Sequence, residues 1–199
     1  MDNKIDENKI IVTFDICSSS NIIEDLHLTN NLSKYINLLV SLKRFLRDNA
    51  STIGYEVYKF TGDGWIILFP DTVTGNCVMD FLNKLSVHFK KEIKRVTAIL
   101  EMKPEIIGIT FGVDIGRLSK IIMLGKREYI GRAINIACRL QTAIKDKDGR
   151  PQYKVLMSKH AFKTMKLELD RYKPRSVTRN LRNIHNGKRY ECIKLDLLG

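Results

Sequence analysis

Short apolar runs alternate along the chain with longer stretches in which apolar residues recur at helical spacing. Residues 9–14 form an apolar, β-rich run of the length expected for a buried strand. Residues 32–46 carry apolar side chains at helical spacing, so we expect a long helix that ends near residue 48. Two strand-like runs then flank a Gly-Asp-Gly turn, which predicts a β-hairpin over residues 55–69.

The second half of the chain continues this alternation. It predicts a helix over 77–100, then a strand pair over 106–115 and 120–124 that turns at Gly116, and then a charged loop over 125–129. A helix over 132–144 and a strand at 155–157 follow. The chain is then expected to form a short helix capped by Ser158, a basic stretch and a last strand over 190–195. Helices that alternate with hairpins indicate an α+β sandwich, with helices flanking a mainly antiparallel sheet. We expect residues 1–199 to form a single domain.

The composition is ordinary for a globular protein of 199 residues, with 44% hydrophobic and 28% charged residues. No apolar run approaches the ~20 residues of a membrane span, and the polar amino terminus lacks the apolar core of a signal peptide. We therefore expect a soluble, cytoplasmic protein with no membrane partner. The four cysteines show no CxxC spacing, so reduced thiols are expected in place of a zinc site or disulfides.

The formal charge of +12 favours an anionic partner such as a phosphate group, or reflects a solvated basic surface. The basic residues are densest between positions 171 and 189. No aromatic residues interleave with them as they would in a base-stacking platform. We therefore do not expect a nucleic-acid partner.

Two segments each carry one carboxylate at the end of a predicted strand. Residues 10–20 read IIVTFDICSSS, and residues 58–69 read YKFTGDGWIILF. If the two strands are neighbours, Asp15 and Asp63 converge at one end of a sheet. A carboxylate pair there can hold Mg²⁺ or Mn²⁺ against a polyphosphate, because these hard cations prefer oxygen ligands and keep positions open for substrate.

A third segment, residues 129–140, reads YIGRAINIACRL and predicts a helix with one apolar stripe and one polar face. Asn135 and Arg139 are four residues apart on the polar face and point the same way. Such a pair is compatible with a solvated helix surface as well as with a binding role.

Together, the three segments resemble the class III nucleotide cyclases, the family of adenylate and guanylate cyclases. The resemblance implies a catalytic domain with a ferredoxin-like, palm-type core. It implies conversion of a ribonucleoside triphosphate to its 3′,5′-cyclic monophosphate and pyrophosphate. Two divalent ions per site, Mg²⁺ or Mn²⁺, would be held by Asp15, Asp63 and the carbonyl of Ile16.

The same resemblance implies how phosphates are bound. Ser18, Ser19 and Ser20 lie at an expected helix start, where backbone N–H groups would bind the β- and γ-phosphates. Arg182 precedes the last strand, where the family carries a basic residue for the terminal phosphates.

For the reaction itself, the resemblance assigns Asn135 to ribose positioning and Arg139 to the charge on the pentavalent phosphorus. Family members are head-to-tail dimers in which one subunit supplies the metal residues and the other supplies the Asn and Arg. Because this chain carries both sets, the resemblance implies a homodimer with two sites at its interface.

Two positions read the base in this family, and here they are Lys59 and Glu128. Adenylate cyclases pair Lys with Asp or Thr, and guanylate cyclases pair Glu with Cys, so this pair departs from both. Lys59 only donates hydrogen bonds and ionised Glu128 only accepts them. Adenine, cytosine and uracil can each satisfy such a pair.

The short, divergent sequence, with Arg132 where the family usually has Asp, resembles the bacterial Pycsar-type pyrimidine cyclases of anti-phage signalling. That resemblance implies cyclic CMP or cyclic UMP as the product, read by a separate effector that the cyclase does not bind. An adenylate cyclase is the alternative.

Two hypotheses from other classes remain open. An inactive cyclase-like domain would bind nucleotide without releasing pyrophosphate. A polymerase-like palm protein would extend a primer, but it would have no use for Asn135 and Arg139.

Overall fold

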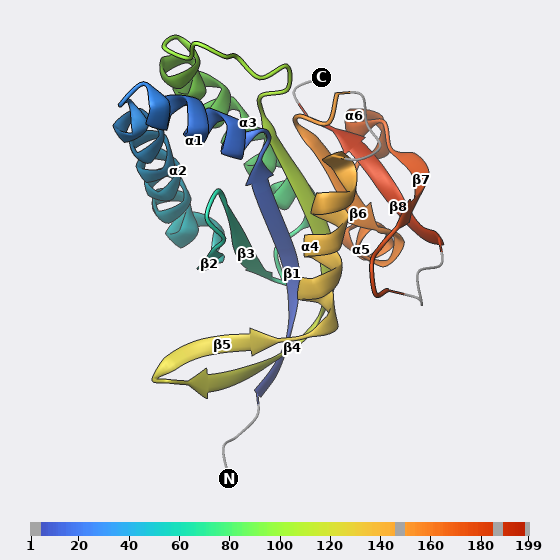
Figure 1. The fold of residues 1–199 in the computed structure, drawn as a ribbon. Helices are drawn as coiled ribbons and strands as arrows, with labels where there is room; N and C mark the ends of the chain where they lie inside the picture. The colour runs from blue at the N-terminus through green and yellow to red at the C-terminus, as the bar shows by residue number, and fades with distance from the viewer. Residues whose placement is uncertain (1–4, 146–149, 185–188, 198–199) are drawn as a thin grey trace.

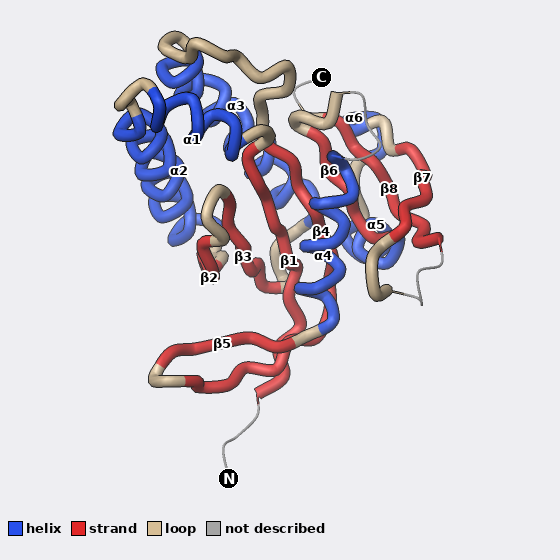
Figure 2. Tube along the Cα trace, viewed as in Figure 1, coloured by secondary structure: helices blue, strands red, loops and turns tan. Residues whose placement is uncertain are grey.

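The computed structural model of the protein describes residues 5–145, 150–184 and 189–197. The other residues of the predicted 1–199 domain lie outside these described ranges. Its strands form one sheet in the order β2-β3-β1-β4-β6-β8-β7, with β5 paired to β4 off this path (Figures 1 and 2). The strands are β1 (Ile5–Ile16), β2 (Glu56–Phe60), β3 (Gly64–Pro70), β4 (Ile109–Met123), β5 (Lys126–Ile130), β6 (Lys154–Ser158), β7 (Arg175–Asn180) and β8 (Arg189–Asp196). The helices are α1 (Ser19–Leu28), α2 (Leu32–Ile53), α3 (Gly75–Thr97), α4 (Arg132–Lys145), α5 (Lys159–Met165) and α6 (Leu169–Tyr172).

The sheet is mainly antiparallel, which confirms the predicted α+β class. Among the described strand pairs, only β4 and β6 are parallel. The predicted hairpin is present as β2 and β3, and Ser158 caps α5 by accepting a hydrogen bond from the Ala161 N–H at 3.0 Å. Strand β7 lies within the stretch that the sequence marked only as basic.

Helices cover both faces of the sheet because successive side chains of a strand point to opposite sides. On one face, Val12 and Phe14 of β1 join the buried core formed with α1, α2 and α3. On the other face, Ile11 packs with Ala133 and Ala137 of α4. Figure 1 shows α4 crossing in front of β1 and β4, with α3 behind the sheet.

The long second helix extends further than the sequence suggested, to Ile53. Gly54 ends it with φ at +85°, and its N–H donates to the Ala50 carbonyl at 2.8 Å. Glycine adopts this left-handed conformation without steric cost, so the helix stops at Gly54 and not near residue 48.

The predicted turn at Gly116 is wrong. Strand β4 runs straight through it, and a Cβ there would lie 3.2 Å from the Cβ of Ala133, so the small residue serves the packing of α4. The chain turns instead at Gly125, with φ at +73°. The expected charged loop is therefore strand β5, and the β4–β5 hairpin projects away from the rest of the sheet (Figure 1).

Within the described residues, no helix has the length and the apolar run needed to cross a bilayer. None of the four cysteines forms a disulfide.

Candidate active site

Asp15 and Asp63 lie at the same end of the sheet. Strands β1 and β3 are antiparallel neighbours in which Asp15 pairs with Gly64, so Asp63, one residue before β3, lies beside the end of β1. Both residues line one pocket of about 230 Å³. The structure thus brings the two carboxylates together as the sequence led us to expect.

The two glycines that flank Asp63 serve different purposes. Gly62 has φ at +106°, a conformation that favours glycine. A Cβ at Gly64 would lie 1.9 Å from the carbonyl oxygen of Phe14, so only glycine lets β3 approach β1 this closely. One glycine makes the turn and the other sets the spacing between the strands that carry the aspartates.

Each aspartate has a polar neighbour from a different helix. The hydroxyl of Ser19, the first residue of α1, donates to Oδ2 of Asp63. The Nε2 amide of Gln141 in α4 lies 3.5 Å from Oδ2 of Asp15 and donates to Thr110 at 2.9 Å. The sequence analysis did not single out Gln141, although it follows Ala137 by four residues and so falls on the buried stripe of the helix.

The predicted phosphate-binding serines surround the start of α1. Ser18 is the N-cap with φ at +58°, and its hydroxyl donates to the Ile106 carbonyl at 2.8 Å. Ser19 is buried against Asp63, whereas Ser20 is exposed. A helix does begin beside the aspartates, but the hydroxyls of Ser18 and Ser19 already have protein partners.

The donor set fits a divalent ion shared with a substrate. Ile16 ends β1 directly after Asp15, and no three His, Cys, Asp or Glu side chains cluster in the described part of the chain. Magnesium sites are commonly built from one or two carboxylates, with water and phosphate oxygens completing the shell. Two carboxylates beside a helix start match that pattern.

A buried hydroxyl in the core has no hydrogen-bond partner among the described residues. It belongs to Tyr35 of α2, which is 2% exposed. Burial, together with the negative charges of Asp63 and Asp15, raises the pKa of this hydroxyl far above its usual range.

The two predicted base-reading residues lie together on neighbouring elements. Lys59 Nζ of β2 is 3.8 Å from Oε2 of Glu128 in β5. The Tyr58 hydroxyl donates to the same oxygen at 2.5 Å and accepts from the Tyr129 N–H at 3.1 Å. Tyr58 is a third member of this group that the sequence analysis missed.

The remaining predicted residues lie around α4 and do not line the pocket of the aspartates. Asn135 is exposed and Arg139 is half-buried. Arg182 is exposed, and it follows Leu181, which packs against Ile136 and Leu140 of α4. Within one chain, Cys138, Gln141 and Thr142 of α4 line the pocket of the aspartates, whereas Asn135, Arg139 and Arg182 form a second group of predicted residues outside it.

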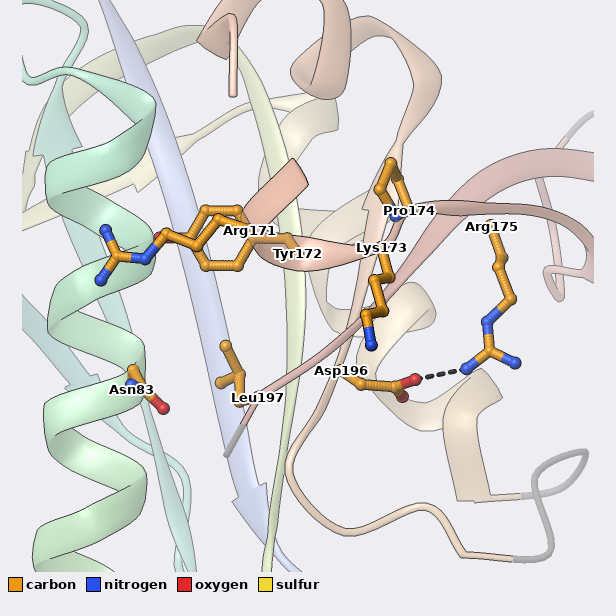
Figure 3. A pocket seen from close by; sticks show the side chains of 8 residues that line it. All are labelled: Asn83, Arg171, Tyr172, Lys173, Pro174, Arg175, Asp196 and Leu197. Atoms are coloured by element: carbon orange, nitrogen blue, oxygen red, sulfur yellow. Dashed lines mark hydrogen bonds and ion pairs between the residues drawn. The ribbon is translucent and has the colours of Figure 1, made fainter. Parts of the chain in front are cut away.

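A larger pocket of about 840 Å³ contains none of the predicted site residues (Figure 3). Asn83 of α3, residues 171–175, Asp196 and Leu197 line it. Its two arginines are engaged, since Arg171 pairs with Asp80 at 2.8 Å and Arg175 pairs with Asp196. Size alone therefore does not single out a candidate site, whereas the pocket shared by the two carboxylates does.

Comparison with solved structures identifies the fold. A bacterial light-regulated adenylyl cyclase superposes with a TM-score of 0.71 at 18% identity, covering 97% of this chain and 52% of that one. The guanylyl cyclase Cya2 gives 0.71 at 15% identity, with coverages of 98% and 94%. The adenylyl cyclase CyaB from P. aeruginosa gives 0.71 at 19% identity, with coverages of 96% and 95%.

The chain has the class III cyclase fold. It spans about half the length of the light-regulated enzyme, and nearly all of Cya2 and CyaB. No protein-family model and no curated protein sequence matches the chain. At these identities the class III fold is established, and the activity has to be argued from the site.

Proposed function

We propose that the protein is a nucleotide cyclase, which converts a ribonucleoside triphosphate to its 3′,5′-cyclic monophosphate and pyrophosphate. The observation that carries this proposal is the pocket shared by Asp15 and Asp63 beside the start of α1. Adenylyl and guanylyl cyclases among the structural neighbours support it.

In this proposal, Asp15, Asp63 and the Ile16 carbonyl hold two divalent ions, Mg²⁺ or Mn²⁺. The ions supply Lewis-acid activation of the ribose 3′-hydroxyl and neutralise charge on the phosphates. Backbone N–H groups at the start of α1 bind the β- and γ-phosphates, since a helix N-terminus attracts anions.

The second group of residues completes the reaction. Asn135 holds the ribose, and the guanidinium of Arg139 stabilises the negative charge that grows on the phosphorus, because it stays cationic and its planar fork spans two oxygens. Arg182 contacts the terminal phosphates.

We propose that these two groups meet across a homodimer. The pocket of about 230 Å³ is smaller than the ~300–1,000 Å³ usual for ligand sites, as half of a shared site would be. The projecting hairpin also exposes apolar side chains, with Ile122 70% and Leu124 97% accessible, and exposed apolar patches commonly mark interfaces.

For the base, we propose a pyrimidine, with cyclic CMP or cyclic UMP serving as an anti-phage signal read by a separate effector. The contact between Lys59 and Glu128 supports their joint role but accommodates adenine equally well by hydrogen bonding. Cyclic AMP production is therefore the alternative, and an inactive nucleotide-binding domain is the further one.

The test is incubation with each of the four ribonucleoside triphosphates and Mn²⁺, followed by mass identification of the products. We expect cyclic CMP or cyclic UMP, and cyclic AMP would favour the alternative. Asp63→Asn should abolish product formation. Asp71→Asn is the matched control, because Asp71 is exposed and bonds only to Asn8 among the described contacts. Bound nucleotide without any cyclic product would refute the proposed activity.

A further inference from the structure

Gln141 is a polar side chain on the face of α4 that packs against the sheet. It follows Ala137 by four residues and is only 8% exposed. Burying an amide costs free energy unless its groups form hydrogen bonds. An apolar residue would fill this place at lower cost, so the contacts of the Gln141 amide indicate its role.

The close approach of α4 to the sheet fixes the position of Gln141. Thr13 of β1 and Gly112 of β4 are paired across these two strands. The Thr13 hydroxyl donates to the Ala137 carbonyl at 3.2 Å. A Cβ at Gly112 would lie 2.0 Å from the same carbonyl oxygen and 2.5 Å from the backbone nitrogen of Gln141. The helix is therefore held against both strands, and the backbone of Gln141 lies directly over β4.

The Gln141 amide spans a second cross-strand pair, in which Asp15 of β1 lies opposite Thr110 of β4. Its Nε2 donates to the buried Thr110 hydroxyl at 2.9 Å and lies 3.5 Å from Oδ2 of Asp15. Because Nε2 carries two hydrogens, it can serve both oxygens at once. Gln141 and Asp15 also line the same pocket of about 230 Å³. The amide thus reaches the carboxylate from a position that the helix and Thr110 both hold.

We propose that Gln141 is a positioning residue of the metal site, whose amide orients the Asp15 carboxylate before a divalent ion binds. This inference rests on the metal site of the proposed function. The amide carries no net charge, so it can donate to the carboxylate without repelling a cation bound there, as a lysine or an arginine would. Partners that orient metal ligands in this way typically raise metal affinity by about 10–100-fold.

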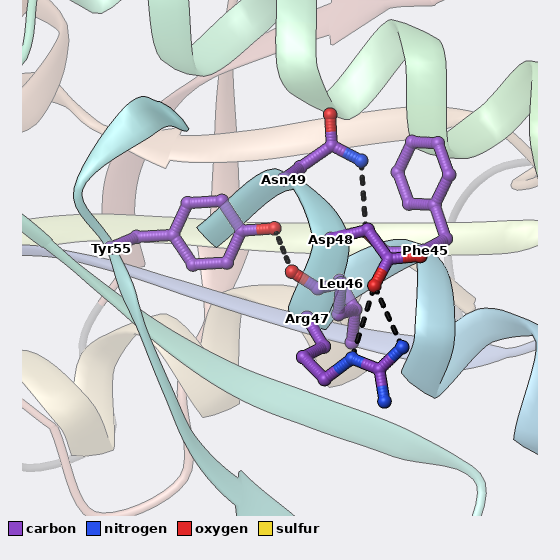
Figure 4. A network of polar contacts seen from close by, with 6 residues as sticks. All are labelled: Phe45, Leu46, Arg47, Asp48, Asn49 and Tyr55. Carbon is purple, nitrogen blue, oxygen red and sulfur yellow. Dashed lines mark hydrogen bonds and ion pairs between the residues drawn. The ribbon is translucent and has the colours of Figure 1, made fainter. Parts of the chain in front are cut away.

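Gln141→Met is the test substitution, because it keeps the approximate length and volume of the side chain and removes the donor. Tyr55→Phe is the control, since it removes a buried hydrogen bond at a residue that does not line the pocket. Tyr55 is 6% exposed, and its hydroxyl donates to the Leu46 carbonyl of α2 at 2.5 Å (Figure 4). Tyr55→Phe should lower the melting temperature by about 2–4 °C and leave the site as it is.

The deciding experiment is a Mn²⁺ titration without nucleotide, in which free Mn²⁺ is followed by electron paramagnetic resonance. We expect Gln141→Met to weaken Mn²⁺ binding about tenfold. Tyr55→Phe should bind like the wild type despite its lower melting temperature, and Asp63→Asn should not bind. A merely structural Gln141 would change the melting temperature and leave the Mn²⁺ affinity unaltered.

A second substitution tests whether Thr110 acts through the amide. Thr110→Val removes the hydroxyl that holds Nε2, so it should weaken Mn²⁺ binding by less than Gln141→Met does. The double variant should bind no more weakly than Gln141→Met alone, because the hydroxyl has no route to Asp15 once the amide is gone. Losses that add up in the double variant would overturn this coupling.

The outcomes separate this inference from the proposed function. Wild-type affinity in Gln141→Met overturns the role of Gln141, whatever the enzyme produces. A wild-type protein that forms cyclic nucleotide but binds no Mn²⁺ by itself also overturns it. A protein that binds Mn²⁺ with the expected loss in Gln141→Met, yet forms no cyclic product, supports the inference and refutes the cyclase.

Discussion

At the residue scale, Glu128 is held by Tyr58 as well as by Lys59. Both neighbours contact the same oxygen, Oε2, and only the tyrosine contact is short, at 2.5 Å against 3.8 Å. The hydroxyl of Tyr58 therefore fixes the direction of the Glu128 carboxylate, which in the proposed function faces the base. We infer that base selection depends on this orientation.

Tyr58→Phe should leave kcat nearly unchanged and lower the preference for the chosen base, as a ratio of kcat/KM values, by about three- to tenfold. The measurement is competition between CTP, UTP and ATP in one reaction. Tyr129→Phe is the control, because the Tyr129 hydroxyl donates to Glu56 at 3.0 Å and not to Glu128. An unaltered preference in Tyr58→Phe would remove this residue from the base site.

Sequence patterning could not have found Tyr58. Strict alternation along a strand places adjacent residues such as Tyr58 and Lys59 on opposite faces. The pairing of β2 with β3 shifts register between Val57 and Lys59, and this bulge lets both neighbours reach Glu128. By contrast, Asp15 and Asp63 could be predicted, because each ends or precedes a strongly apolar strand.

At the scale of elements, the distance between β1 and β3 decides whether the two aspartates can share an ion. Gly64→Ala would force these strands apart, since its Cβ has the Phe14 oxygen at 1.9 Å. We expect a loss of about 1–3 kcal/mol in the free energy of unfolding, together with loss of product formation. Chemical denaturation and the product assay measure the two effects.

Gly54→Ala is the control for this substitution. Its φ is +85°, so alanine is strained there and should cost about 1 kcal/mol, but no atom lies within 4 Å of the added Cβ. Turnover should persist in the folded Gly54→Ala protein. If Gly64→Ala also keeps full turnover, the close strand spacing is not what the site requires.

The parallel contact of β4 with β6 carries a buried carboxyl that makes stability depend on pH. Burial raises the pKa of Asp114, although a hydrogen bond from Ser158 at 2.5 Å and the positive charges of His160 and Arg132 partly oppose this. Tyr190 of β8 also faces this group.

Because the folded pKa of Asp114 is raised above 3.8, the folded state binds this proton more tightly than the unfolded chain does. The contribution of protonated Asp114 to the free energy of unfolding is complete below the pKa that Asp114 has in the unfolded chain. It is lost as the pH rises through the pKa that Asp114 has in the folded protein. Asp114→Asn should remove that loss, so its advantage over the wild type should grow as pH rises above about 4. Urea denaturation across pH 4–8 measures this, and parallel pH profiles for the two proteins would exclude it.

The element scale also shows what hydrophobic spacing can reveal. The apolar β3 and the amphipathic α4 were predicted, because each buries one strong face in the core. The β4–β5 hairpin was not, because its second strand, Lys126–Ile130, opens with three charged residues, and its first strand ends in a continuous apolar run in which Ile122 is 70% exposed. A partner that covers the hairpin would bury these exposed apolar side chains.

At the scale of the whole molecule, the two groups of site residues are separate within one chain. Asp15 and Asp63 share a pocket that neither Asn135 nor Arg139 lines. In the proposed function, a monomer holds two half-sites, and a two-fold dimer would join each to the complementary half of its partner. Leu124→Asp, at a residue 97% exposed on the hairpin, should shift sedimentation toward monomer and reduce turnover in proportion.

Mixing two inactive variants tests this arrangement directly. Asp63→Asn removes a carboxylate from one half-site, and Arg139→Ala removes the guanidinium from the other, so each homodimer should be inactive. In a mixed dimer, one site carries both defects and the other carries neither. Random exchange makes half of the dimers mixed, each with one intact site of two, so an equal mixture should regain about a quarter of wild-type activity. If both groups acted within one chain, every site in the mixture would contain a defect and no activity would return.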